Sequence, residues 1–139
     1  MSLLPQSNLL IEHSFISSTL NKKVDSCLSP HGISFTEYTI MYHLHSAEGM
    51  AMSRIHLANN IGLTASGITR LLAPMEKIHI VVKESNPRDA RQSLVRLSAA
   101  GEQLFQDASV AVEHTAQSAF SLFSKKELQL LSELNNKIK

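Results

Sequence analysis

The chain has 139 residues, of which 43% are hydrophobic and 18% charged, and its formal net charge at pH 7 is +1. This length suits a single domain with a core of its own, and no apolar run approaches the roughly twenty residues that a membrane-spanning helix needs. One cysteine excludes an internal disulfide framework; because the start of the chain also lacks the pattern of a signal peptide, we expect a cytoplasmic protein.

The first part of the chain predicts two helices. Apolar or weakly polar side chains recur at intervals of three or four and so form one helical stripe: Leu9, His13, Ile16, Leu20, Val24 and Cys27. The segment Ser29-Pro-His-Gly32 is expected to end this helix. Ser34 and Glu37 have the spacing of a capping box. They predict a second helix to about Ser46 that carries Tyr38, Met41, Tyr42 and Leu44.

Residues 53–77 have the layout of a helix, a glycine-containing turn and a second helix. Leu57, Ala58 and Ile61 share one face of the short first helix. Gly62 can adopt the left-handed conformation that ends a helix, and Thr64 can cap the free amides of the next one. This pattern predicts a helix-turn-helix.

The second helix of this unit has distinct inner and outer faces. Its apolar residues recur at steps of three and four and are expected to point inward together: Ile68, Leu71, Leu72 and Met75. Ser66, Gly67, Thr69 and Arg70 remain on the outer face, which is small at its start and cationic further along. Such a face suits the major groove of DNA. Pro74 predicts a kink or an early end near Leu72, because proline lacks the backbone donor of a helix interior.

Two β-branched segments follow, at residues 80–84 and 93–97, and they predict paired strands. The intervening segment, Ser85-Asn-Pro-Arg-Asp-Ala-Arg-Gln92, is polar throughout. Together they predict a hairpin with a long basic tip, which is called a wing.

The ordered set of motifs resembles the MarR family of bacterial transcriptional regulators. The matching pieces are Leu57-Ala58, Ile61-Gly62-Leu63-Thr64, Thr69-Arg70-Leu71, Glu76-Lys77, Asp89-Ala-Arg91 and Val95-Arg-Leu-Ser-Ala-Ala-Gly101. The Asp-x-Arg wing followed by a Leu-Ser-x-x-Gly helix start is the most specific part. The resemblance spans roughly the whole chain, although its motifs lie between residues 53 and 101. It implies a mainly α fold with a small β-hairpin wing, in which terminal helices build a homodimer.

The C-terminal part predicts two more helices, and the longer one needs partners on two sides. It starts at Ser98, runs to about Leu122 and carries one stripe of Leu104, Ala108 and Ala111 and another of Phe105, Val112, Ala116 and Phe123. Ser124 and Glu127 form a second capping box. We therefore expect one domain over residues 1–139, with a winged helix-turn-helix at 34–97 and dimerisation helices at 1–30 and 98–139.

The positive charge is concentrated in the middle of the chain. Residues 53–97 hold seven basic and three acidic residues, a net charge of +4, whereas residues 1–52 and 98–139 carry −2 and −1. Because DNA affinity depends on local cationic density, this distribution favours binding of double-stranded DNA. For a two-fold dimer the expected site is a near-palindromic operator.

Eleven residues are candidates for the DNA interface: Arg54, Thr64, Ala65, Ser66, Gly67, Thr69, Arg70, Lys77, Arg88, Asp89 and Arg91. Small residues at the helix start allow a phosphate to approach. Thr69 and Arg70 are the candidates for base contact, and Arg91 for the minor groove. Arg54, Lys77 and Arg88 are expected to contact phosphates. The resemblance implies that Asp89 orients an arginine. A salt bridge within the chain is the alternative role for Arg70.

The predicted function is that of a sequence-specific transcriptional regulator, most simply a repressor released by a signal. A small aromatic ligand is one candidate signal, with His13, Tyr38, Tyr42 and His43 as lining residues; packed side chains are the alternative. A thiol-based redox sensor at Cys27 and a winged-helix interaction module without DNA binding are the competing functions. No catalytic motif, cofactor loop or His-x-x-x-His pair is present, so neither an enzyme nor a metal site is expected.

Overall fold

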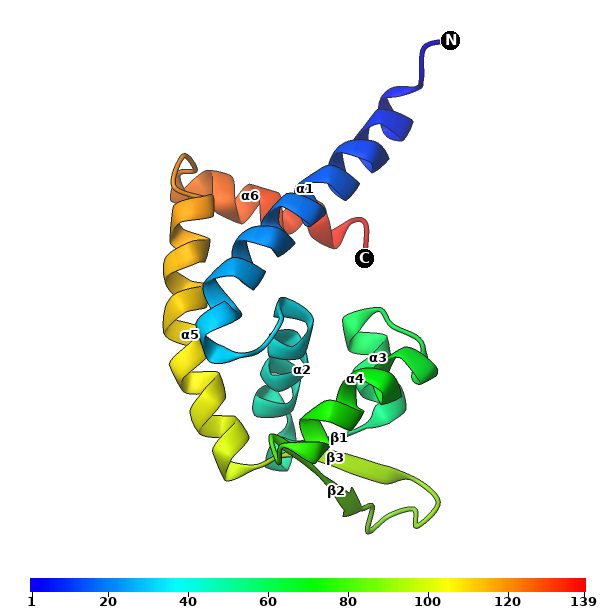
Figure 1. Ribbon diagram of the computed structural model, residues 1–139. Helices are drawn as coiled ribbons and strands as arrows, with labels where there is room; N and C mark the ends of the chain where they lie inside the picture. The colour runs from blue at the N-terminus through cyan, green and yellow to red at the C-terminus, as the bar shows by residue number, and fades with distance from the viewer.

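The computed structural model describes residues 1–139 and is mainly helical, with one small antiparallel sheet (Figure 1). This confirms the expected fold class. No helix combines the length and apolar character needed to cross a membrane. The elements in chain order are α1 (Pro5–Leu28), α2 (Phe35–Ser46), β1 (Ala51–Ser53), α3 (Arg54–Ile61), α4 (Ala65–Lys77), β2 (Val81–Ser85), β3 (Ser93–Leu97), α5 (Ala99–Ala119) and α6 (Lys125–Asn136), with short 3-10 turns at Ser29–His31 and Glu48–Met50.

The helix ends form where side-chain caps and left-handed glycines were expected. Ser34 and Glu37 cap α2 reciprocally, and Ser124 and Glu127 do the same for α6. Gly62 ends α3 with a φ of 79°. These local signals depend only on neighbours in sequence, which is why they could be recognised without knowledge of the fold.

The sheet has the order β1-β3-β2, and both pairs of strands are antiparallel. Strands β2 and β3 form the predicted hairpin, in which Val81 lies opposite Leu97 and Ser85 opposite Ser93. Strand β1 was not predicted. It has three residues, too few to show an alternating pattern, and it forms because Met52 lies opposite Val95 of β3. The sheet is thereby anchored directly to the start of α3.

The core lies between α2, the helix-turn-helix, the sheet and the first half of α5. Its fully buried side chains are Leu28, Ile40, Met41, Leu44, Leu57, Ile68, Leu72, Met75, Val81 and Val95. Phe105 and Ala108 of α5 join the same cluster. Three of the four apolar residues predicted to face inward from α4 are fully buried, and Leu71 is half-buried against them.

Of the two effects expected of Pro74, a kink or an early end near Leu72, the early end is not seen, because the helix continues to Lys77. Proline removes one backbone donor, but Met75 is 1% exposed, so packing holds the last turn in place. The amide of Ile78 also donates to the carbonyl of Pro74, at 3.2 Å. Tertiary packing therefore outweighs the local helix-breaking tendency.

The terminal helices leave much of their apolar surface uncovered within one protomer. In Figure 1 the first half of α1 projects away from the rest of the molecule. Of the predicted stripe along α1, only Val24 is buried; Leu9 and Ile16 are about half exposed. Helix α5 ends at Ala119 rather than near Leu122, because Phe120–Phe123 form a turn before the cap of α6. Helix α6 has no buried residue.

Glu102 of α5 makes a contact that predicts a pH dependence of stability. Nδ1 of His45 in α2 lies 2.9 Å from Oε2 of Glu102, and this hydrogen bond holds the pKa of Glu102 below its ordinary value. The contribution is present above the ordinary carboxyl pKa of about 4.3 and is lost as the pH falls through the lowered pKa. We expect the free energy of unfolding, measured with urea, to fall over that acidic range. The variant Glu102→Gln should lose part of this fall; an identical pH profile would contradict the assignment.

Candidate DNA-binding interface

The outer face of α4 is free at its start. Ser66, Thr69 and Arg70 are exposed, whereas Ile68 on the opposite side is fully buried. Arg70 makes no salt bridge within the chain, so the alternative role considered for it is not seen. The helix therefore presents a hydroxyl and a guanidinium side by side on an exposed face.

The N-terminus of α4 is capped by a short side chain, and the residues around the cap are small. The hydroxyl of Thr64 accepts the amide of Gly67 at 3.0 Å and lies 3.2 Å from the hydroxyl of Ser66. A Cβ at Gly67 would lie 3.1 Å from the Thr64 hydroxyl, so even alanine would crowd the cap. Free amides at such a helix start favour an anion.

A hollow of about 270 Å³ separates the start of α4 from the wing. Four of the predicted site residues line it: Arg54, Ala65, Thr69 and Arg91. Ser53, Ile55, Gln92 and Ser93 complete the lining and were not predicted. The fold thus joins α3, α4 (the recognition helix of the motif) and the wing into one concave surface, although the wing is distant from both helices in sequence.

Every acidic side chain of residues 53–97 is paired with an arginine. Glu76 binds Arg54, Asp89 binds Arg91, and Glu84 binds Arg96. The remaining four basic residues, Arg70, Lys77, Lys83 and Arg88, form no salt bridge. All four are exposed. The net charge of +4 is therefore carried by side chains that are available for an external anion.

Arg54 was expected to contact a phosphate, but within the chain its side chain is paired. Its guanidinium donates to Oε1 of Glu76 in α4, and its side chain is only 20% exposed. A guanidinium held by a carboxylate is partly neutralised, so its main contribution is to join α3 to α4. Arg54 nevertheless lines the hollow between α4 and the wing, together with Ser53 and Arg91.

Asp89 lies where the resemblance implied an arginine-orienting carboxylate. Its Oδ1 accepts the backbone amide of Arg91 at 3.0 Å and lies 3.4 Å from Nε of the same residue. The side chain of Arg91 is 93% exposed, so the pair directs the guanidinium without covering it. The loop that carries it is tightened by Asn86, whose side chain accepts the amide of Arg88.

Arg96 holds the wing to the body of the protein. The sequence marks it only as one of the seven basic residues of the segment 53–97. It donates two hydrogen bonds to Glu84 on β2, at 2.9 and 3.1 Å, and a third to the carbonyl of Gly49 at 2.8 Å. The hydrogen bond and charge of Glu84 raise the pKa of Arg96 above its ordinary value. Strand β2 is thereby fixed to the turn before β1.

The four residues expected to line a ligand site are not gathered around one hollow of a single protomer, and their role in ligand binding stays a prediction. The hydroxyl of Tyr38 lies 2.8 Å from that of Ser109, and its ring stacks on Phe105 at 5.1 Å, so Tyr38 is packed between α2 and α5. Tyr42 and His43 contact each other edge to face, and His13 is exposed on α1. None of the main surface hollows is lined by these four side chains.

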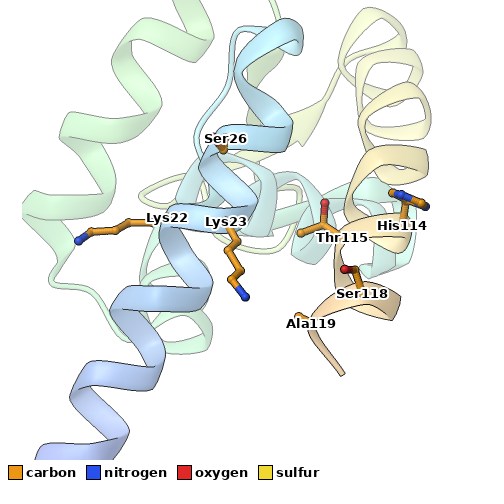
Figure 2. A pocket seen from close by; sticks show the side chains of 7 residues that line it. All are labelled: Lys22, Lys23, Ser26, His114, Thr115, Ser118 and Ala119. Atoms are coloured by element: carbon orange, nitrogen blue, oxygen red, sulfur yellow. The ribbon is translucent and has the colours of Figure 1, made fainter. Parts of the chain in front are cut away.

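A different hollow, of about 490 Å³, lies between α1 and α5 (Figure 2). Lys22, Lys23 and Ser26 line it from α1, and His114, Thr115, Ser118 and Ala119 from α5. No carboxylate lines it, and Lys23 extends into the space between the two helices in Figure 2. A smaller apolar hollow adjoins it and shares Lys23, Thr115 and Ala119. This composition suits an anion.

Cys27 is half-buried and packs against the core from α1. No group of three or more potential metal ligands converges anywhere in the chain.

The combination of α3, α4 and a β-hairpin beside the recognition helix defines a winged helix-turn-helix protein. No family model matches the chain. A curated relative, the uncharacterized HTH-type transcriptional regulator YhbI of Bacillus subtilis (strain 168), is 24% identical over 113 residues, which cover 81% of this chain and 72% of YhbI.

Solved structures specify the fold further. AbsC, a MarR family transcriptional regulator from Streptomyces coelicolor, superposes with a TM-score of 0.88 at 20% identity and covers 99% of this chain and 95% of its own. Sco3205 is another MarR family transcriptional regulator from Streptomyces coelicolor, solved in complex with DNA. It superposes with a TM-score of 0.87 at 20% identity and covers 99% of this chain and 89% of its own. The chain has the fold of the MarR family regulators, so the resemblance found in the sequence is confirmed at the level of the fold.

Proposed function

We propose that the protein is a sequence-specific DNA-binding transcriptional regulator that acts as a homodimer. The observation that supports this most directly is the concave surface between α4 and the wing. It carries exposed Thr69 and Arg91, with Arg70 alongside on α4, while every acidic side chain of the segment is already paired. A surface with exposed cations and no free carboxylate attracts the phosphate backbone.

In this arrangement α4 enters the major groove, where Thr69 and Arg70 contact base edges. Arginine matches the two acceptors of guanine, a contact that contributes about 1–3 kcal/mol of discrimination. The start of α4 lies against a phosphate, and Arg91 of the wing reaches the adjacent minor groove. Lys77, Lys83 and Arg88 contribute affinity without sequence information. DNA complexes are known for a protein of this fold, Sco3205.

A dimer is supported by the uncovered apolar surface of the terminal helices. Ile11 and Phe15 of α1 are 60% and 72% exposed, and Leu130 and Leu134 of α6 are 53% and 46% exposed. Side chains of this size are normally covered, and patches of several of them mark interaction surfaces. A second copy of the chain, related by a two-fold axis, covers both patches and places two recognition helices one DNA turn apart, about 34–36 Å.

The salt dependence of DNA binding tests this proposal. Three or four unpaired cations from each protomer predict six to eight neutralised phosphates and a slope of about −5 to −7 in log affinity against log salt. Selection from random duplexes at 50 and 200 mM salt, followed by mobility shift, should enrich a near-palindrome and show this slope. If no duplex shifts at low salt, the chain is an interaction module and the proposal fails.

The hollow between α1 and α5 is the better candidate for an effector site than the aromatic residues first considered. Two lysines, a histidine and three hydroxyls line it without a carboxylate, which favours a small molecule with an anionic group. A bound effector that shifts α1 against α5 changes the separation of the two recognition helices and releases the operator. The proposed regulator is accordingly a repressor that blocks the promoter sterically.

A further inference from the structure

We propose that Ser98 and Gly101 set the angle between α5 and the recognition helix, and thereby fix the spacing of DNA half-sites that the dimer accepts. The inference rests on the proposed function. It concerns the contact between the first turn of α5 and the segment that follows α4, a contact that none of the DNA-facing residues makes.

The hydroxyl of Ser98 joins the start of α5 to the turn after α4. It donates to the carbonyls of His79 and Ile80, at 2.6 and 3.0 Å. The backbone amide of Ser98 also donates to the carbonyl of Ile80, at 3.0 Å. The same hydroxyl caps α5 by accepting the amide of Gly101 at 3.0 Å. One side chain therefore starts α5 and binds the turn that ends α4.

Gly101 allows the two backbones to approach without an intervening side chain. A Cβ at this position would overlap the carbonyl oxygen of Ile80 and lie 2.7 Å from Cδ1 of Leu97. These neighbours are a backbone oxygen and a core leucine that is 2% exposed, so neither can move away cheaply. Any larger residue must tilt α5 away from the turn.

The turn itself is rigidly held. His79 has a φ of 62°, a left-handed conformation that non-glycine residues keep only where the surroundings impose it. The amide of His79 donates to the backbone carbonyl of Glu76, and the amide of Ile80 donates to the backbone carbonyl of Met75, a residue that is buried near the end of α4. A movement of this turn therefore moves the recognition helix with it.

Helix α5 connects this contact to the far side of the molecule. Its 21 residues span roughly 30 Å, from the turn after α4 to the hollow lined by His114 and Ser118 and on to α6. Figure 1 shows α5 running along one side of the molecule between these two ends. A small tilt at its first turn becomes a larger displacement between the two terminal regions, and hence between the two recognition helices of a dimer.

A half-site spacing series tests the inference. Duplexes with the selected half-sites are made with the spacer changed by one and two base pairs in each direction, together with a single half-site duplex. We expect wild type to prefer one spacing. We expect Gly101→Ala and Ser98→Ala to change the ratio of affinities between that spacing and its neighbours at least tenfold. Ser98→Thr, which keeps the hydroxyl, should restore the wild-type profile.

Ser34→Ala is the matched control, because it removes the cap of α2 and touches neither α4 nor α5's first turn. A merely structural role lowers the folded fraction and reduces all affinities by the same factor, so it leaves the ratio unchanged. If folded Gly101→Ala and Ser98→Ala both keep the wild-type spacing profile, the inference is overturned. If wild type itself binds no duplex, the proposed function fails instead.

A readout without DNA measures the helix separation directly and keeps the inference testable where Gly101→Ala folds poorly. Cys27 is the only cysteine, so Cys27→Ser combined with Ser66→Cys places one spin label on each recognition helix. Adding Ser98→Ala should shift or broaden the distribution of distances between the two labels, and adding Ser34→Ala should not. An unchanged distribution for Ser98→Ala, or an equal change for Ser34→Ala, would overturn the inference.

Discussion

Replacement of Phe15 by glutamate is expected to convert the dimer into monomers and to lower the affinity for a two-half-site duplex at least about a hundredfold. Phe15 is 72% exposed in one protomer and lies one turn after Ile11 on the projecting part of α1. Burying a carboxylate in an apolar interface without a partner is costly. Losing the second recognition helix removes the gain from simultaneous binding, which is commonly 10²–10⁴.

Sedimentation equilibrium gives the oligomeric state, and mobility shift gives the affinity. Tyr42→Glu is the control, because it places the same charge on a half-exposed aromatic side chain of α2, outside the terminal helices. We expect this control to remain a dimer. Affinity for a single half-site duplex should be nearly equal for wild type and Phe15→Glu. A Phe15→Glu protein that stays dimeric would show that Phe15 lies outside the dimer interface.

The elements whose limits are set by neighbouring residues could be predicted from the sequence. The caps at Ser34, Thr64 and Ser124 and the left-handed Gly62 are all present, since each involves side chains and amides within a few residues. The same locality explains the error at Pro74. Its effect on an isolated helix is clear, but the burial of Met75 that overrides it depends on the whole fold.

The residue types of the candidate site could be predicted from the sequence, but the salt bridges among them could not. The excess of positive charge was evident, whereas the partners of Arg54 and Arg96 were not, because Glu76 and Glu84 lie 22 and 12 residues from them in sequence. The pairing of Arg91 with Asp89, two residues apart, could be expected from the family motif. Strand β1 and the lining residues Gln92 and Ser93 likewise depend on contacts between distant segments.

The lining of a ligand site is difficult to predict for a related reason. Tyrosines and histidines on a helix suit both a ligand pocket and a core, and only the packing partners distinguish these roles. Phe105 and Ser109 of α5 supply such partners for Tyr38. The polar hollow between α1 and α5 combines two helices from opposite ends of the chain, so no local motif marks it.

Replacement of Arg70 by alanine is expected to relax the preferred DNA sequence, whereas replacement of Arg88 should weaken binding to all sequences alike. Arg70 is exposed on α4, forms no salt bridge and lies next to Thr69. Removal of one arginine–guanine interaction costs about 1–3 kcal/mol at each half-site, which is roughly 5- to 150-fold. Arg88 is exposed at the wing and contributes only charge.

The measurement is the affinity of each variant for the selected operator and for operators substituted at one base pair, at a fixed salt concentration. For Arg70→Ala, the penalty for one substituted position should fall to near zero, because the group that distinguishes the bases is gone. For Arg88→Ala, every penalty should persist while the salt slope becomes less negative, by about one for each phosphate that the variant no longer neutralises. Equal reductions in affinity for specific and random DNA in Arg70→Ala would assign Arg70 to the phosphate backbone and leave Thr69 as the residue that contacts bases.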